Sequence, residues 1–198
     1  MARSFIRHYF SNYTPIYTIY SASLPMTKLK ILEFPDKRLR KKSQSISDFD
    51  DSLRVLAKDM LETMYEAPGI GLAAPQVNIF KRLIVIDISP EKHTPQVFVN
   101  PVIEAVLGSA KIESEEGCLS VPSFYERVTR SEAIKVDYFD VEGNPHQLSA
   151  DGLLAICIQH EVDHLDGKLF VDYLSKLKRD RIRTKLLKQQ RTALKTSS

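Results

Sequence analysis

The chain has 198 residues, of which 43% are hydrophobic and 27% are charged, a balance typical of a soluble globular protein and not of a disordered or membrane-spanning one. No uninterrupted apolar run approaches the roughly 18–20 residues that a bilayer span requires. Cysteine occurs only at Cys118 and Cys157, too few for a disulfide scaffold and compatible with a reducing compartment. We therefore expect one domain of ordinary size that does not enter a membrane.

The charge is unevenly distributed along the chain. Residues 176–195 contain nine Lys or Arg and one Asp, a local charge of +8, whereas the whole chain carries +3 and the remainder therefore carries −5. The basic character is a property of the C-terminal tail.

The N-terminal segment, residues 1–25, reads "MARSFIRHYFSNYTPIYTIYSASLP" and contains no Asp or Glu. It lacks the apolar central run of a secretory signal. We expect a poorly structured extension upstream of a natural start at Met26, with an organelle-type transit peptide as the alternative.

The next segments predict one helix and three strands. "DDSLRVLAKDMLETMYEAPG", from residue 50, has apolar residues at helical spacing, Asp residues suited to an N-cap and Pro68-Gly69 at its end. Residues 82–88, 96–101 and 133–140 are β-branched runs bounded by Pro, Gly and Asn, a pattern typical of strands.

Two further helices are predicted towards the C-terminus. "ADGLLAICIQHEVDHLDG" begins near Asp151 and ends at Gly167, which can adopt the left-handed geometry of a helix end. The basic tail is the last helix, and Leu177, Ile182 and Leu186 are expected to pack on the domain. Because strands and helices do not alternate strictly, the order favours an α+β fold over a doubly wound parallel sheet.

A His-Glu-x-x-His motif lies near the end of the second helix. Residues four apart share a helical face, so His160 and His164 can bind one ion, and Glu161 can reach a water beside it. The alternative is a solvated helix end carrying histidines and acids. The position of Glu161 and the apolar run before it favour the metal site.

Neither of the downstream ligands that metalloproteases use with this motif is present, and the acids that follow the motif are Asp166, Asp172 and Asp180. Metalloproteases that extend the motif use a later His, but that position holds Phe170, and those that use a later Glu find none after Glu161. Cys118 is a better candidate, because a thiolate with two imidazoles leaves a fourth tetrahedral position for water, and Gly117 lets the backbone approach the ion.

Cys157 competes with Cys118 for this role. A ligand three residues before His160 on one rigid helix would crowd the ion, and Leu153, Ile156 and Cys157 form a continuous face with His160 that predicts a pocket wall. A Cys118–Cys157 disulfide is the other alternative, and it would abolish the metal site.

Three motifs now resemble one known family. "GIGLAAPQ" (69–76), "EGCLS" (116–120) and "QHEVDHLDG" (159–167) are similar in order and spacing to those of peptide deformylases, and the likeness extends from about Lys28 into "LFVDYLSKLK". The resemblance implies antiparallel β-sheets packed around a central metal-binding helix. It also implies a metallohydrolase that removes the formyl group from N-formylmethionyl peptides and releases formate.

The resemblance assigns roles to residues of the motifs. It implies one divalent ion per chain, natively Fe(II), with Zn(II), Ni(II) or Co(II) as alternatives, a proton-transferring carboxylate, and two donors to the oxyanion that forms from the formyl oxygen. The ligands are Cys118, His160 and His164, the carboxylate is Glu161, and the donors are the Leu119 backbone N–H and the Gln76 side-chain amide.

Substrate-binding residues are implied in the same way. The methionine pocket is formed by Ile70, Leu153, Ile156 and Cys157, and the backbone at Gly71 pairs with the bound peptide. Glu116 and Arg130 match an ion pair that braces the Cys118 strand. After "CLSVP" the chain reads "SFYERV", where some relatives place an arginine, so contacts beyond the methionine stay open.

The expected organisation is an extension at 1–25, a catalytic domain at 26–172 and a basic helix with a tail at 173–198. The expected partners are N-formylmethionyl nascent peptides and, through the basic helix, the ribosome near its exit tunnel, with no membrane contact. We expect a monomer in the bacterial cytoplasm, or an organelle if the extension is a transit peptide. Two rival functions remain, a zinc endopeptidase and a structural-zinc module that binds RNA.

Overall fold

The structure is a computed structural model that describes residues 28–106 and 108–196. The predicted N-terminal extension, residues 1–25, lies outside the described residues. In chain order the elements are η2 (Lys37–Arg40), α1 (Asp51–Glu66), β1 (Gly71–Ala73), η3 (Ala74–Val77), β2 (Leu83–Ile86), β3 (Gln96–Ala105), β4 (Lys111–Cys118), β5 (Val121–Ser131), β6 (Ala133–Phe139), β7 (Pro145–Asp151), α2 (Gly152–Leu165), η4 (Phe170–Tyr173) and α3 (Lys176–Thr196), where η marks a 3-10 helix.

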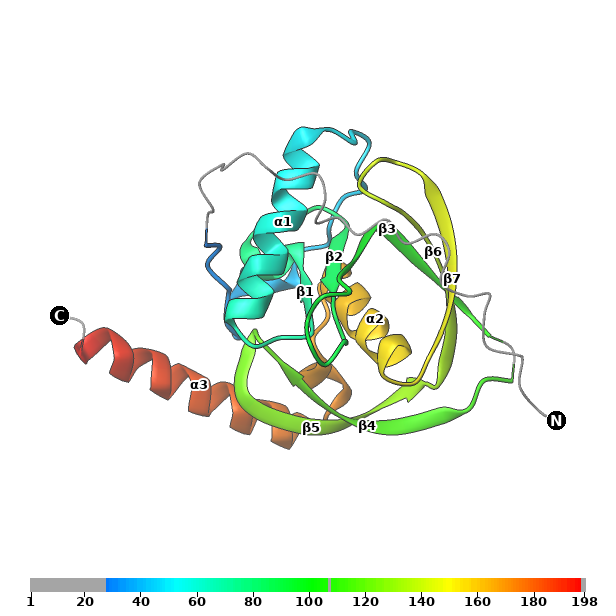
Figure 1. The fold of residues 1–198 in the computed structure, drawn as a ribbon. Helices are drawn as coiled ribbons and strands as arrows, with labels where there is room; N and C mark the ends of the chain where they lie inside the picture. Colours follow the sequence, from blue (N-terminus) through cyan, green and yellow to red (C-terminus); the bar gives the residue numbers. More distant parts are fainter. Residues whose placement is uncertain (1–27, 107, 197–198) are drawn as a thin grey trace.

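The described strands form two antiparallel sheets (Figure 1). One has five strands in the order β1-β2-β3-β6-β7, and the other is the hairpin of β4 and β5. The predicted α+β class is confirmed. In Figure 1 the helix α2 lies near the centre of the molecule, with strands of the two sheets around it.

The strand β2, inside the five-stranded sheet, is buried on both faces. Leu83 and Val85 of β2 pack in the core that contains α1, whereas Ile84 and Ile86 pack in the core that contains α2. Successive side chains of a strand point to opposite faces. The uninterrupted apolar run of β2 therefore follows from a sheet that is covered by a helix on each side.

A third core joins α3 to the hairpin. It contains Ile182 and Leu186, as predicted, but the prediction for Leu177 is wrong, because its side chain is 81% exposed. Leu177 lies five residues before Ile182, and five steps of a helix end about 140° away on its surface, outside the packed stripe. No helix within residues 28–106 and 108–196 has the length and apolar character to cross a bilayer.

The helix at 51–66 begins as predicted, since the Asp50 side chain accepts a hydrogen bond from Leu53 N at 3.1 Å. The sequence analysis did not identify β1, β4, β5 or β7. The hairpin sequence "KIESEEGC" of β4 is mostly polar because one face of the hairpin is exposed. Its strand character comes from pairing with β5 and not from its own residues.

Candidate metal centre and substrate pocket

Three side chains of types that can bind metal converge where the hairpin meets α2. Cys118 ends β4, and His160 and His164 lie one turn apart on α2. Their candidate ligand atoms all lie within 4.8 Å of one another, and Cys118 Sγ is 3.3 Å from His164 Nε2. Both cysteines are free, so the disulfide alternative is wrong. The cluster contains Cys118 and not Cys157.

His160 is held in one orientation by Glu116. Its Nδ1 lies 2.8 Å from Glu116 Oε2, which leaves Nε2 for an ion. Arg130 donates to the same carboxylate from Nε at 2.7 Å and from Nη2 at 3.0 Å. Burial alone would raise the pKa of Glu116, but the hydrogen bonds from Arg130 and His160 lower it to about 2. Glu116 is therefore an anion that accepts a hydrogen bond from the imidazole Nδ1–H.

Glu161 lies beside the cluster in an apolar environment. Its side chain is buried, and burial raises its pKa to about 7. Among the described residues its Oε2 has no hydrogen-bond partner. A carboxyl group with this pKa can both accept and donate a proton near neutral pH.

The first glycine-rich motif passes directly over α2. A Cβ at Gly71 would meet Glu161 Oε1 and would lie 2.9 Å from Cys157 Sγ. Only glycine lets β1 run this close to the carboxylate. The need for glycine at position 71 therefore follows from the packing of β1 on α2.

Gln76 faces Cys118 from the end of the same motif. Its Oε1 accepts from Ala73 N at 2.7 Å, and its Nε2 donates to Ser120 Oγ at 3.1 Å and lies 3.6 Å from Cys118 Sγ. The side chain is buried, so these contacts fix the amide beside the thiol. The sequence analysis missed Ser120, although it lies within the "EGCLS" motif.

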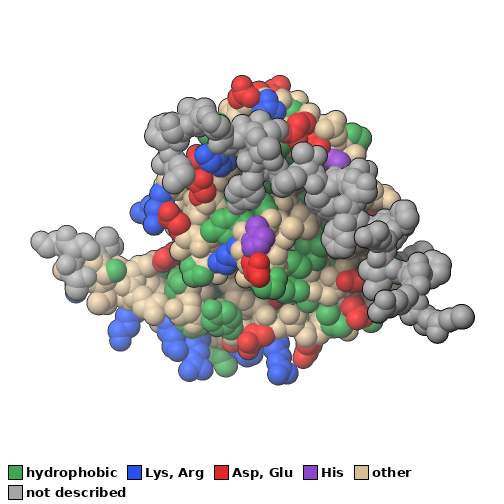
Figure 2. Space-filling view, viewed as in Figure 1, with side chains coloured by type: hydrophobic (Ala, Val, Ile, Leu, Met, Phe, Trp, Pro, Cys, Tyr) green, Lys and Arg blue, Asp and Glu red, His purple; other side chains and the backbone are tan. Residues whose placement is uncertain are grey.

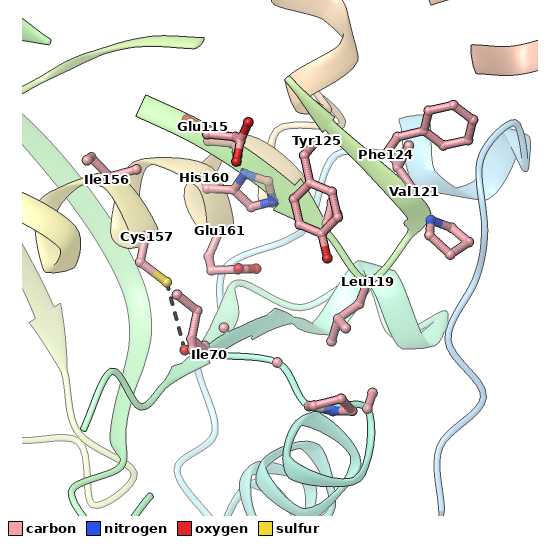
Figure 3. A pocket seen from close by; sticks show the side chains of 18 of the residues that line it. Ile70, Glu115, Leu119, Val121, Phe124, Tyr125, Ile156, Cys157, His160 and Glu161 are labelled. Carbon is pink, nitrogen blue, oxygen red and sulfur yellow. Dashed lines mark hydrogen bonds and ion pairs between the residues drawn. The ribbon is translucent and has the colours of Figure 1, made fainter. Parts of the chain in front are cut away.

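A cavity of about 420 Å³ opens next to these groups (Figure 3). Its lining includes every predicted pocket and donor residue, namely Ile70, Gly71, Gln76, Leu119, Leu153, Ile156 and Cys157. Ile70 and Leu153 are 43% and 51% exposed, so they form the rim, whereas Ile156 and Cys157 are buried in the wall. Burial also raises the pKa of Cys157, which is therefore a neutral thiol.

Glycine is required at position 117 for a further reason. A Cβ at Gly117 would lie 2.5 Å from the Tyr125 ring, so glycine makes room for an aromatic side chain. Tyr125 is 66% exposed and occupies the "SFYERV" stretch at the edge of the cavity. It is labelled beside Leu119 in Figure 3.

The described residues fit a divalent ion. One thiol and two imidazoles are a suitable donor set for Fe(II), Zn(II), Ni(II) or Co(II). Burial lowers the pKa of His164, as do the positive charges of His160 and Arg130, so this imidazole is neutral and able to bind metal.

Comparisons with known proteins agree with this geometry. A model of the family described as polypeptide deformylase matches residues 28–180. The peptide deformylase of Azotobacter vinelandii is 59% identical over 167 residues, which cover 84% of this chain and 98% of that protein. Peptide deformylase 1 of Pseudomonas syringae pv. tomato is 57% identical over 166 residues, which cover 84% of this chain and 98% of that protein.

Solved structures give the same result. The crystal structure of a peptide deformylase from Legionella pneumophila matches with a TM-score of 0.79 at 49% identity, covering 85% of this chain and 98% of that one. That of the Ehrlichia chaffeensis enzyme in complex with actinonin matches with a TM-score of 0.79 at 41% identity, covering 84% and 99%. The zinc-endopeptidase and structural-zinc alternatives receive no support. The chain belongs to the polypeptide deformylase family, metal-dependent enzymes that remove N-formyl groups from nascent peptides.

Proposed function

We propose that Cys118, His160 and His164 hold the divalent ion with which this chain removes the formyl group from N-formylmethionyl peptides. The observation that carries the proposal is the convergence of these three donors within 4.8 Å beside a buried carboxyl group of pKa about 7. We infer Fe(II) as the native ion, with Zn(II), Ni(II) or Co(II) as substitutes. When bound, such an ion supplies Lewis acidity and lowers the pKa of a water from about 15.7 towards about 7.

Glu161 moves the proton. It accepts the proton of the attacking water at Oε2, the oxygen that has no partner among the described residues. The water oxygen bonds to the formyl carbon, and the carbon–nitrogen bond then breaks. Glu161 returns the proton to the leaving amine nitrogen, because an amine expelled without a proton is a very poor leaving group. The products are formate and a free N-terminal methionine.

Gln76 and Leu119 are proposed to stabilise the oxyanion. One N–H of the Gln76 amide is taken by Ser120, while the other faces Cys118 Sγ across a long contact of 3.6 Å. Both residues line the cavity, and we propose that this second N–H and the backbone N–H of Leu119 donate to the formyl oxygen. Removing such a donor typically costs about 2.7–4 kcal/mol of transition-state stabilisation.

The methionine side chain is proposed to enter the apolar part of the cavity. Ile70, Leu153, Ile156 and Cys157 supply its walls, and the Gly71 backbone pairs with the peptide. The high pKa of Cys157 keeps an uncharged thiol against the apolar side chain.

The helix α3 is proposed to dock on the ribosome near the exit tunnel. Lys and Arg side chains gather along the lower edge of the molecule in Figure 2, where α3 lies. The exposed cations of the helix are Lys176, Lys178, Arg181, Arg183, Lys185, Lys188, Arg191 and Lys195. A surface of RNA phosphates would attract them, with an affinity that falls steeply as salt rises.

This docking is tested with exposed residues that leave the packing intact. Replacing Arg181, Arg183 and Lys188 with Gln should weaken ribosome binding and reduce the slope of log affinity against log salt by about 0.7–0.9 per lost phosphate contact. Binding that is insensitive to salt in both proteins would exclude the proposal.

We propose that residues 26–172 form the catalytic domain and that 173–198 are a helix and tail appended to it. We further propose a monomer in the bacterial cytoplasm, where formylated chains are made, with an organelle as the alternative. N-terminal sequencing of the native protein and sedimentation analysis would test these points.

The reaction is tested by formate release from formyl-Met-Ala-Ser. The protein is purified without oxygen and loaded with iron or nickel, and Glu161→Gln serves as the control. We expect release by the original chain and not by the control, and inhibition by actinonin. Failure of a verified metal-loaded sample to release formate would exclude the proposed reaction.

A further inference from the structure

A closed ring of hydrogen bonds joins α2 to the hairpin. It runs from His160 to Glu116 on β4 and from Glu116 to Arg130 on β5, through the contacts described above. From there Arg130 Nη1 donates to Asp163 Oδ2 at 2.5 Å. Asp163 lies three residues after His160 on α2, so the ring closes on the helix where it began.

Tyr173 reinforces the ring from η4. Its hydroxyl donates to Asp163 Oδ2 at 2.7 Å, and the Arg130 guanidinium lies 4.8 Å from the centre of its ring. Arg130 is thereby fixed by Glu116 and Asp163 at its edges and by Tyr173 on its face. A planar guanidinium held in this way has one orientation.

The ring lies next to the candidate metal ligands in the sequence of both elements. Cys118 follows Glu116 by two residues on β4, and His164 follows Asp163 directly on α2. The hairpin that carries the thiol and the helix that carries the imidazoles are therefore tied at points adjacent to the ligands. The tie is stiff, since Glu116 and Arg130 are each only 5% exposed and water does not compete for their hydrogen bonds.

We propose that Asp163 and Tyr173 are positioning residues of the metal centre, which hold the Cys118 strand at the correct distance from His160 and His164 through Arg130 and Glu116. This inference rests on the proposed ligand set. It assigns a role in metal retention to Asp163 of α2, which lies between the two histidines. It assigns the same role to Tyr173 of η4, which precedes α3.

Removing either group should loosen the metal site without altering the cavity. In Asp163→Asn the side chain keeps its size but loses the charge that holds Arg130 Nη1. In Tyr173→Phe the ring beside Arg130 stays and only the hydroxyl is lost. Neither residue lines the cavity, so the effect should fall on metal retention and on kcat rather than on KM.

The experiment uses the full chain loaded with Co(II), whose visible absorption reports ligand geometry and thiolate bonding. The rate of metal transfer to a chelator is measured beside the spectrum. Substitution of groups that orient metal ligands typically costs about 10- to 100-fold in affinity. We expect a faster transfer of that order for Asp163→Asn and of about 2- to 10-fold for Tyr173→Phe, each with an altered spectrum.

Glu126→Gln is the matched control. Glu126 also lies on β5 and forms an ion pair with Lys178 of α3 at 2.7 Å, but it lies outside the ring. We expect it to leave the spectrum and the transfer rate unchanged. The proposal would be overturned if Asp163→Asn and Tyr173→Phe had the same Co(II) spectrum and metal-transfer rate as the original chain. Equal effects of all three variants would also overturn it.

Measurements on the original chain distinguish a failure of the proposed ligand set from a failure of the proposed positioning role. If it binds one Co(II) with thiolate absorption, the ligand set stands and the variants test positioning alone. If it binds no Co(II), the ligand set fails and the positioning role fails with it. Thermal unfolding of the metal-free variants completes the test, because a purely structural role would lower Tm and leave the Co(II) spectrum of the folded protein unchanged.

Discussion

The helices α2 and α3 are built from the same backbone geometry but work in opposite environments. α2 is buried over most of its surface, including His160, Glu161 and His164, whereas α3 buries only a narrow stripe that contains Ile182 and Leu186. Burial raises the pKa of Glu161 to about 7. Most cations of α3 are exposed to water, where salt screens their interactions. A helix thus supplies chemistry when it is enclosed and electrostatic attraction when it is exposed.

The largest expected difference between the two helices is in the rate of deformylation. Glu161→Gln should lower kcat by about 10²- to 10⁴-fold, because the amide can neither accept nor return the proton. Lys185→Gln on α3 should leave formate release from a short peptide unchanged. Steady-state kinetics on metal-loaded proteins would check this, and a similar loss in both variants would remove the distinction.

The next difference is in stability. Ile158 is completely buried on α2, so Ile158→Ala should lower the free energy of unfolding by about 2–5 kcal/mol through lost burial and a cavity. Leu177→Ala on α3 should change it by no more than about 0.5 kcal/mol, since that side chain is 81% exposed. Urea unfolding measures both values. A large effect at Leu177 would contradict the packing of α3 described here.

The enclosed carboxyl group also predicts a pH dependence in the metal-free protein. The pKa of Glu161 rises from 4.5 to about 7 on folding, so the folded protein keeps a proton that the unfolded chain has lost. The contribution of Glu161 to the free energy of unfolding should therefore be fully present below pH 4.5 and fall by roughly 3 kcal/mol as pH rises to about 7.

The contribution of Glu161 is isolated by comparing Glu161→Gln with the original chain across this pH range. The difference between their unfolding free energies should vary with pH in the sense given above. A constant difference would show that Glu161 does not hold its proton in the folded protein.

The smallest effect is expected on the exposed helix. Lys178→Ala breaks the ion pair with Glu126 on β5, and the Lys178 side chain is 57% exposed. Pairs of this kind contribute about 0–1 kcal/mol, and salt weakens them further. Thermal unfolding at low and high salt would detect it. A loss well above 1 kcal/mol would mean that α3 is held by charge and not by its apolar stripe.

The enclosed parts of the molecule were also the easier ones to predict. The helix around His160 and the strand at 82–88 carry apolar runs that identify them, and the chemistry of the motifs pointed to Cys118 as the third donor. The hairpin of β4 and β5 was not predicted, because one of its faces is exposed and its strands therefore carry many polar residues. The prediction that Leu177 packs on the domain was wrong. Three apolar residues are too few to show which side of the helix faces the core.

Contacts between distant segments could not be predicted from the sequence. The links from Arg130 to Asp163 and from Asp163 to Tyr173 join three elements, and no local pattern signals which polar residues will meet. Asp163 lies within the His-Glu-x-x-His motif, directly before His164. Its partner becomes apparent only when β5 lies against α2.

The positions of the three donors along the chain have a consequence for the order of events in the cell. His160 and His164 come together as soon as one helical turn forms, but Cys118 precedes His160 by 42 residues and arrives only when the hairpin docks. A complete ion site therefore cannot exist before the fold is finished. If these three residues are the ligands, we expect metal to be acquired only after the hairpin has docked on α2.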